Sequence, residues 1–160
     1  MLLGPQLART IADFGATHVI WLPDTTLGQW EEALETSASF QLLRVCREGE
    51  SWPLAAGLYL GGKSPLVVMQ STGLFESGDA LRNVLFDLKI PLFSLIGYRS
   101  YLVEDSRDTA KKYAEPILNA WGLHYELIGG PEDLPRLTKH YRDCQAAGKP
   151  GVGLIAEGRM

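Results

Sequence analysis

Cysteine and histidine are scarce in this chain of 160 residues, and their placement excludes several kinds of site. Cys46 and Cys144, its two cysteines, lie far apart and outside any Cys-x-x-Cys motif, which argues against a redox motif and against a structural metal site. Cys46 is expected in a buried strand and Cys144 in an amphipathic helix, so both are predicted to be unreactive thiols. His18, His124 and His140 share no metal-ligand spacing, and we predict neither a metal site nor a catalytic histidine.

The chain also lacks a long apolar run and a cluster of basic residues. No run approaches the ~20 apolar residues that cross a bilayer, and the N-terminal residues lack a basic region followed by a long apolar one. The formal net charge is -4, and the fifteen Lys and Arg residues are scattered. We therefore expect a cytoplasmic protein whose partners are neither nucleic acids nor membranes.

Short apolar runs alternate with segments of helical periodicity along the whole chain. This alternation is typical of a parallel sheet covered by helices on both faces. The sequence predicts one domain over residues 1–160, an α/β fold with a doubly wound, six-stranded, mostly parallel sheet. The predicted strands are His18 to Leu22, Phe40 to Cys46, Pro65 to Gln70, Pro91 to Gly97, His124 to Ile128 and Gly151 to Ala156.

The last predicted helix has an apolar stripe. It presents Leu134, Leu137, Tyr141 and Cys144 at spacings of three and four residues, which favours packing of this stripe on the sheet with Lys139 and Arg142 facing water.

In doubly wound sheets, ligands bind beyond the carboxyl ends of the strands, so the residues that follow each predicted strand are the candidates for a site. These segments are Pro23-Asp24-Thr25-Thr26, Arg47-Glu48-Gly49-Glu50, Ser71-Thr72-Gly73-Leu74 and Tyr98-Arg99-Ser100-Tyr101. Asp24 either faces this site or caps the helix that begins near Leu27, and Thr25 with Thr26 are further candidates for that cap.

The most informative segment is the one around Glu48, in which a carboxylate ends a strand and a helix of small residues follows. It reads Arg44-Val45-Cys46-Arg47-Glu48-Gly49-Glu50-Ser51-Trp52-Pro53-Leu54-Ala55-Ala56-Gly57. The segment resembles the pyrimidine-binding domain of thiamine-diphosphate enzymes, in which a Glu follows the second strand at a fixed distance before an Ala-Ala/Asp-Gly pattern. Together with Met69 to Leu74, Pro91 to Arg99 and Pro23-Asp24, it resembles the sulfopyruvate decarboxylase alpha subunit and the N-terminal domain of phosphonopyruvate decarboxylase.

This resemblance implies roles for individual residues. Glu48 would be the catalytic carboxylate, hydrogen-bonded to the pyrimidine ring of thiamine diphosphate and favouring the tautomer that takes a proton from the thiazolium ring. Gln70, Ser71, Thr72 and Gly73 would form a small polar loop that borders the pyrimidine. The alternatives are a solvated Glu48 near a helix N-terminus, and an ordinary strand-to-helix cap in which Ser71 or Thr72 satisfies free N–H groups.

The resemblance also implies residues that contact the substrate. Asp24, Thr25 and Arg99 are candidate substrate contacts, because the resemblance implies a 3-substituted pyruvate with a second anionic group, and a guanidinium binds such oxyanions bidentately. The alternative for Arg99 is a surface ion pair with Glu104, Asp105 or Asp108. Glu50 is expected to have no catalytic role.

The chain departs from the family at two places. Ser51-Trp52-Pro53 follows the acidic residues, and Trp52 is expected beside the cofactor or the subunit surface, with Pro53 in the first helical turn. Glu76 replaces the Asn of a Gly-Leu-Gly-Asn pattern and is expected to influence which anion is accepted.

Thiamine-diphosphate enzymes have a second domain that binds the diphosphate, and its sequence pattern is missing from this chain. Gly78-Asp79-Ala80 resembles the Gly-Asp-Gly of that pattern only superficially, because it lies inside a helical pattern. The resemblance therefore implies a separate diphosphate-binding beta subunit that supplies the Mg²⁺ ligands, in an α₂β₂ assembly.

Two other hypotheses remain from the sequence. One is a flavodoxin-like binding or regulatory domain that uses the same sheet edge for a nucleotide or a protein, although no GxGxxG loop follows the first strand. The other is a diverged relative of the decarboxylase subunit that keeps the interface and has lost the activity.

Overall fold

A single parallel sheet forms the centre of the molecule. The computed structural model describes residues 2–24 and 27–158, and within these residues six strands lie in the order β2-β1-β3-β4-β6-β5, with every neighbouring pair parallel. The strands are β1 (His18–Trp21), β2 (Gln41–Arg44), β3 (Pro65–Gln70), β4 (Phe93–Tyr98), β5 (Tyr125–Ile128) and β6 (Gly151–Ala156). The predicted doubly wound α/β fold is confirmed, and the sheet is parallel throughout.

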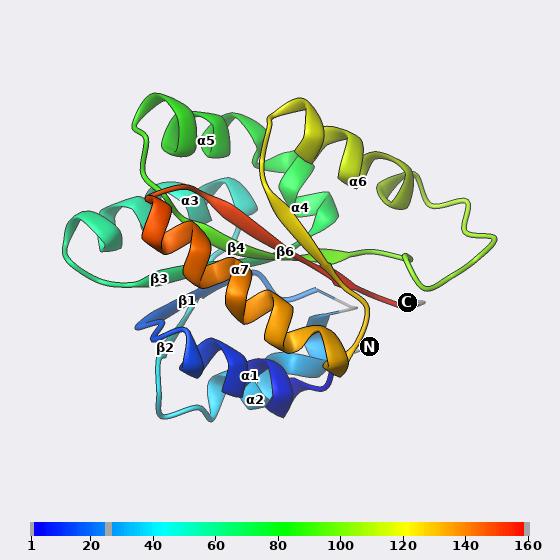
Figure 1. Ribbon diagram of the computed structural model, residues 1–160, viewed down its shortest axis with the longest axis horizontal. Helices are drawn as coiled ribbons and strands as arrows, with labels where there is room; N and C mark the ends of the chain where they lie inside the picture. Colours follow the sequence, from blue (N-terminus) through cyan, green and yellow to red (C-terminus); the bar gives the residue numbers. More distant parts are fainter. Residues whose placement is uncertain (1, 25–26, 159–160) are drawn as a thin grey trace.

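Two helical layers cover the sheet (Figure 1). One layer holds α1 (Gly4–Asp13), the 3₁₀ helix η1 (Leu27–Trp30), α2 (Glu31–Glu35) and α7 (Leu134–Ala147), which follows the short 3₁₀ helix η3 (Pro131–Asp133). The other holds α3 (Glu48–Leu60), α4 (Ser71–Glu76), α5 (Gly78–Arg82), the π-helical segment η2 (Asn83–Asp87) and α6 (Thr109–Ala120). Each layer buries its own apolar core against one face of the sheet.

The last helix, α7, packs as its apolar stripe predicts. Leu137 and Cys144 are buried and Tyr141 packs against the same core, whereas Lys139 and Arg142 are exposed. Gly148 ends the helix with a positive φ of 60°, a conformation that glycine adopts without steric cost.

The second strand is shorter than predicted, and Cys46 lies outside it. The prediction that Cys46 is buried was wrong: its side chain is exposed. The chain leaves the sheet after Val45, whose N–H still donates to the carbonyl of Trp21. The N–H of Cys46 donates instead to Glu50 Oε2, at 3.0 Å, as part of the start of α3.

The two thiols should therefore differ in reactivity. Burial raises the pKa of Cys144, which is the less reactive thiol for this reason as well as for its poor access. We expect one equivalent of a thiol reagent to label the folded chain quickly and a second only after denaturation. Replacing Cys46 by Ser should remove the fast label, and a fast label that persists in this variant would contradict the placement of Cys144.

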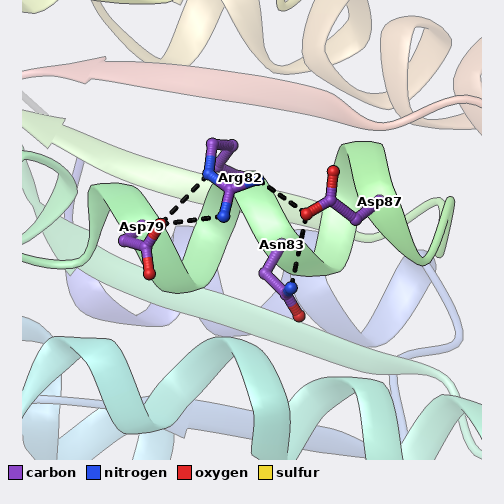
Figure 2. A network of polar contacts seen from close by, with 4 residues as sticks. All are labelled: Asp79, Arg82, Asn83 and Asp87. Atoms are coloured by element: carbon purple, nitrogen blue, oxygen red, sulfur yellow. Dashed lines mark hydrogen bonds and ion pairs between the residues drawn. The ribbon is translucent and has the colours of Figure 1, made fainter.

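The Gly78-Asp79-Ala80 segment lies within the start of α5, as its helical pattern predicts. Figure 2 shows Asp79 turned toward Arg82, whose Nε and Nη2 atoms lie 3.0 Å from Asp79 Oδ1. Arg82 Nη1 also contacts Asp87 Oδ2 at 2.6 Å, which joins α5 to η2. Asp79 thus belongs to an exposed ion-pair network on the helix surface.

In the described part of the chain, no helix combines the length and the apolar character that a membrane span requires.

Candidate active site

The candidate site lies where the connections from two neighbouring strands leave toward opposite faces of the sheet. β1 and β3 are paired, but β1 continues into η1 on one face whereas β3 continues into α4 on the other. Ligands of doubly wound sheets bind at such a switch point, beyond the carboxyl ends of the strands.

A hydrogen bond crosses this switch point. Asp24 Oδ1 accepts from the Leu27 N–H at 2.9 Å, so Asp24 caps η1, the alternative that the sequence left open. The same oxygen accepts from Gln70 Nε2 at 3.2 Å, and Thr72 Oγ1 donates to Gln70 Oε1 at 2.9 Å. The fold therefore brings together three predicted site residues. Thr25, with its proposed capping partner Thr26, lies outside the described residues.

Glu48 is the first residue of α3, and its side chain lies directly against Gly73 in α4. A Cβ atom at Gly73 would stand only 2.5 Å from Glu48 Cγ and 2.9 Å from its Oε1. Since real side chains do not approach so closely, only glycine accommodates this position of the carboxylate. The sequence predicted both residues for the site, and the structure places them in contact.

The segment expected as a polar loop after β3 is helical. α4 begins at Ser71, directly after the strand, because Gln70 already has the extended conformation of a residue that precedes a helix. The alternative that Ser71 or Thr72 caps this helix does not hold, since no side chain does so. Ser71 is fully buried, and its Oγ has no hydrogen-bond partner among the residues described.

Two other carboxylates hold the turn around Glu48. Glu50 Oε2 accepts from the N–H groups of Cys46 and Arg47, at 3.0 and 3.3 Å, which is a capping role. Glu76 Oε1 lies 2.7 Å from Arg47 Nη2, and Glu76 Oε2 accepts from the Gly49 N–H at 2.9 Å. The Arg47 guanidinium and this N–H hold the pKa of Glu76 below its usual range.

Trp52 lies in the core, and the expectation of a ring at the cofactor or subunit surface was wrong. The side chain is fully buried between α3 and the sheet, and its Nε1 donates to Ser77 Oγ at 2.9 Å. Pro53 is in the second turn of α3 rather than in the first, because the helix already starts at Glu48.

Arg99 forms an ion pair with Asp108, one of the partners that its sequence context offered. Its Nε lies 2.7 Å from Asp108 Oδ2, and both side chains are largely buried, with 26% and 20% exposure. Burial alone would raise the pKa of Asp108, but the Ala110 N–H, the Ser100 hydroxyl and Arg99 hold it below its usual range. Arg99 is thus paired within the chain, and its contacts among the described residues do not include Glu48.

Replacing Asp108 by Ala should destabilise the fold by about 1–2 kcal/mol at pH 7, because α6 loses its capping side chain. The depressed pKa of the folded state means that this carboxylate stabilises the fold above pH ~4 and ceases to do so as the pH falls through the folded-state value. Urea denaturation at pH 7 and pH 3 measures both effects. Asp105→Ala, in the same connection, is the control, and an equal loss in both variants would refute the capping role.

Glu157 is a residue at this sheet edge that sequence analysis missed. It follows β6 directly and is only 1% exposed, and its carboxylate lies over Gly97, where a Cβ would be 1.7 Å from Glu157 Oε1. Its N–H donates to the carbonyl of Tyr98 at 3.2 Å. The available signal was a charged residue that closes an entirely apolar strand.

Metal ligands and cavities do not locate the site. Within residues 2–24 and 27–158, no three His, Cys, Asp or Glu side chains are grouped so that they could hold a metal ion. A groove of about 570 Å³ lies between α1 and α2, but its lining includes none of the candidate residues. We place the site by the convergence of polar groups at the switch point instead.

The chain is a doubly wound α/β domain with Glu48, Asp24 and Gln70 at the switch point, beyond the carboxyl ends of its strands. Relatives of known function give the family. The chain is 31% identical over 133 residues to sulfopyruvate decarboxylase subunit alpha of Methanococcus maripaludis, a match that covers 82% of this chain and 80% of that protein. The chain therefore belongs to the family of sulfopyruvate decarboxylase alpha subunits.

Two longer relatives contain a similar region. The sulfopyruvate decarboxylase of Methanosarcina acetivorans is 31% identical over 122 residues, which are 75% of this chain and 32% of that protein. The phosphonopyruvate decarboxylase of Streptomyces viridochromogenes is 23% identical over 150 residues, 92% of this chain and 37% of the relative. The chain thus spans about a third of the length of these two proteins. No family model matches it.

Proposed function

We propose that the chain is the pyrimidine-binding subunit of a thiamine-diphosphate-dependent decarboxylase that acts on a 3-substituted pyruvate. The observation that carries this proposal is the carboxylate of Glu48, which lies at the switch point against a glycine that leaves it room. The family of the chain and the names of its relatives support the same reaction class.

The residues at the edge fit the pyrimidine end of this cofactor. Glu48 would hydrogen-bond a ring nitrogen and hold or transfer a proton there. Gln70 with Thr72 adds an amide and a hydroxyl at the end of β3, whereas the hydroxyl of Ser71 is fully buried and faces the interior. The cofactor, when bound, supplies an electron sink for the carbanion.

The substrate is a 2-oxo acid with a second anionic group, for which sulfopyruvate and phosphonopyruvate are the candidates. In the net reaction the bond from the carboxylate carbon to the carbonyl carbon breaks, CO₂ leaves, and a proton takes its place to give an aldehyde. Asp24 lies close enough to the switch point to influence how the substrate is held. Arg99 would have to exchange Asp108 for the substrate in order to bind its second anion.

The second subunit is proposed to bind the diphosphate and Mg²⁺, in an α₂β₂ assembly. Relatives that match most of their length are named alpha subunits, which implies another subunit. The helix that begins at Glu48 supports an interface, because no charged residue occurs from Ser51 to Gly62 and its outer face exposes Leu54 and Leu60. A groove of about 370 Å³ runs along this face, lined by Pro53, Leu54, Gly57, Leu58, Gly61 and Lys63.

The test is CO₂ release from sulfopyruvate, phosphonopyruvate and pyruvate by the chain co-expressed with a candidate diphosphate-binding subunit, thiamine diphosphate and Mg²⁺. We expect release that requires both chains and the cofactor, and that is faster with one of the two dianionic substrates than with pyruvate. A complex that binds the cofactor but releases no CO₂ would favour a diverged subunit. A chain that never binds the cofactor, with or without a partner, would favour a binding or regulatory domain instead.

A further inference from the structure

Glu76 contacts both neighbours of Glu48 and leaves Glu48 itself untouched. One carboxylate oxygen is 2.7 Å from the Arg47 side chain and the other accepts from the Gly49 N–H at 2.9 Å. Gly73, three residues earlier in α4, receives the Glu48 side chain. We propose that Glu76 is a positioning residue, which fixes the direction of the Glu48 carboxylate by holding the residue on each side of it. This inference rests on the proposed role of Glu48.

Residues 46–50, here called the Glu48 turn, have little conformational freedom. Glu50 binds the N–H groups of Cys46 and Arg47, and Glu76 binds the N–H of Gly49, so the start of α3 is tied to its own first turn and to α4. Without Glu76, the start of α3 would lose its two polar contacts with α4, while the packing of Glu48 against Gly73 would remain. Because catalysis is sensitive to displacements of about 1 Å, loss of this link should matter for the rate.

The same contact should matter little for folding. The Arg47 side chain is 74% exposed and that of Glu76 is 34% exposed, and exposed ion pairs contribute little to stability. The hydrophobic core beneath them is built from other residues, among them Trp52 and Leu74. Effects on activity and on stability can therefore be separated.

The resemblance described under Sequence analysis implies an Asn where this chain has Glu76. An Asn at position 76 could accept a hydrogen bond from an N–H group but would carry no charge for Arg47. The sequence led us to expect an effect of Glu76 on the accepted anion, whereas its contacts point to the Glu48 turn.

The experiment compares Glu76→Ala, Glu76→Gln and Arg47→Met in the complete complex, with Asp79→Ala as the matched control. Asp79 is also an exposed carboxylate paired with an arginine, but that arginine is Arg82, on its own helix (Figure 2). We expect Glu76→Ala to lower kcat on the order of ten- to a hundredfold, with KM and the amount of bound thiamine diphosphate nearly unchanged. Glu76→Gln should recover part of kcat, because its amide oxygen still accepts from Gly49, and the control should match the unmodified complex.

Amide hydrogen exchange gives a readout that does not depend on turnover. In Glu76→Ala the Gly49 amide should exchange about tenfold faster or more, as expected for the loss of a hydrogen bond to a charged group, while the amides of β3 and β4 keep their protection. Unchanged Gly49 exchange, faster exchange throughout the sheet, or an unchanged kcat would each overturn the positioning role. A complex in which Glu48→Gln retains its turnover would instead refute the proposed function, and the Gly49 measurement would still decide whether Glu76 holds the turn.

Discussion

Glu48→Gln should lower the rate of CO₂ release by at least about a hundredfold while the fold stays intact. The substitution keeps the size and the hydrogen-bonding reach of the side chain but removes a group that can hold and transfer a proton, and such groups contribute about 10²- to 10⁴-fold. Gly73 still accommodates the amide, because the two side chains have the same shape. The measurement is kcat in the cofactor-loaded complex, with thermal unfolding as the check on folding.

The matched control is Glu50→Gln, two residues further along α3. Glu50 accepts hydrogen bonds from Cys46 and Arg47, and a glutamine at this position of a helix can do the same. We expect kcat of this variant to remain within about threefold of the parent, since capping is only indirectly linked to the site. Similar rates for both variants, whether high or low, would remove the distinction on which the role of Glu48 depends.

The inner strands of this fold could be predicted because they are short apolar runs covered on both faces of the sheet. β3, β4 and β6 are buried along nearly their whole length, so their sequences are apolar on both faces and stand out from the helices. Strand ends were less predictable. The predicted strand from Phe40 to Cys46 includes apolar residues on either side of β2, whose pairing with β1 runs only from Gln41 to Arg44.

The candidate site could be predicted in part. Topology alone brings Asp24, Gln70 and Gly73 to one edge, because parallel strands end on the same side of the sheet. The partners of individual side chains could not be read in this way. Glu76 lies 29 positions from Arg47, and nothing local in either segment indicates that the two side chains meet.

The misplacement of Trp52 has a similar physical cause. Amphipathic helices such as α7 reveal their buried face through their polar one, but α3 is apolar on nearly all sides after Glu50. The sequence therefore does not tell whether Trp52 or Leu54 faces the sheet. In the structure Trp52 is fully buried and Leu54 is exposed.

Trp52→Ala should consequently destabilise the chain by about 3–5 kcal/mol, the range for removing a large aromatic side chain from a core. The ring fills the space between α3 and the sheet, and its removal also takes away the hydrogen bond from Nε1 to Ser77. Denaturation of the full chain by urea gives the change in the free energy of unfolding. Trp52→Phe, which keeps much of the apolar contact, should lose considerably less.

Leu54→Ala serves as the control on the outer face of the same helix, where a truncation opens no cavity in the described core. We expect its free energy of unfolding to change by less than about 1 kcal/mol, since exposed positions tolerate truncation. If Trp52 lay at the cofactor surface instead, Trp52→Ala would leave the free energy of unfolding nearly unchanged and weaken binding of thiamine diphosphate. The opposite result, a large loss of stability at Trp52 and a small one at Leu54, would place α3 with Trp52 toward the sheet and would leave its apolar outer face available to the proposed second subunit.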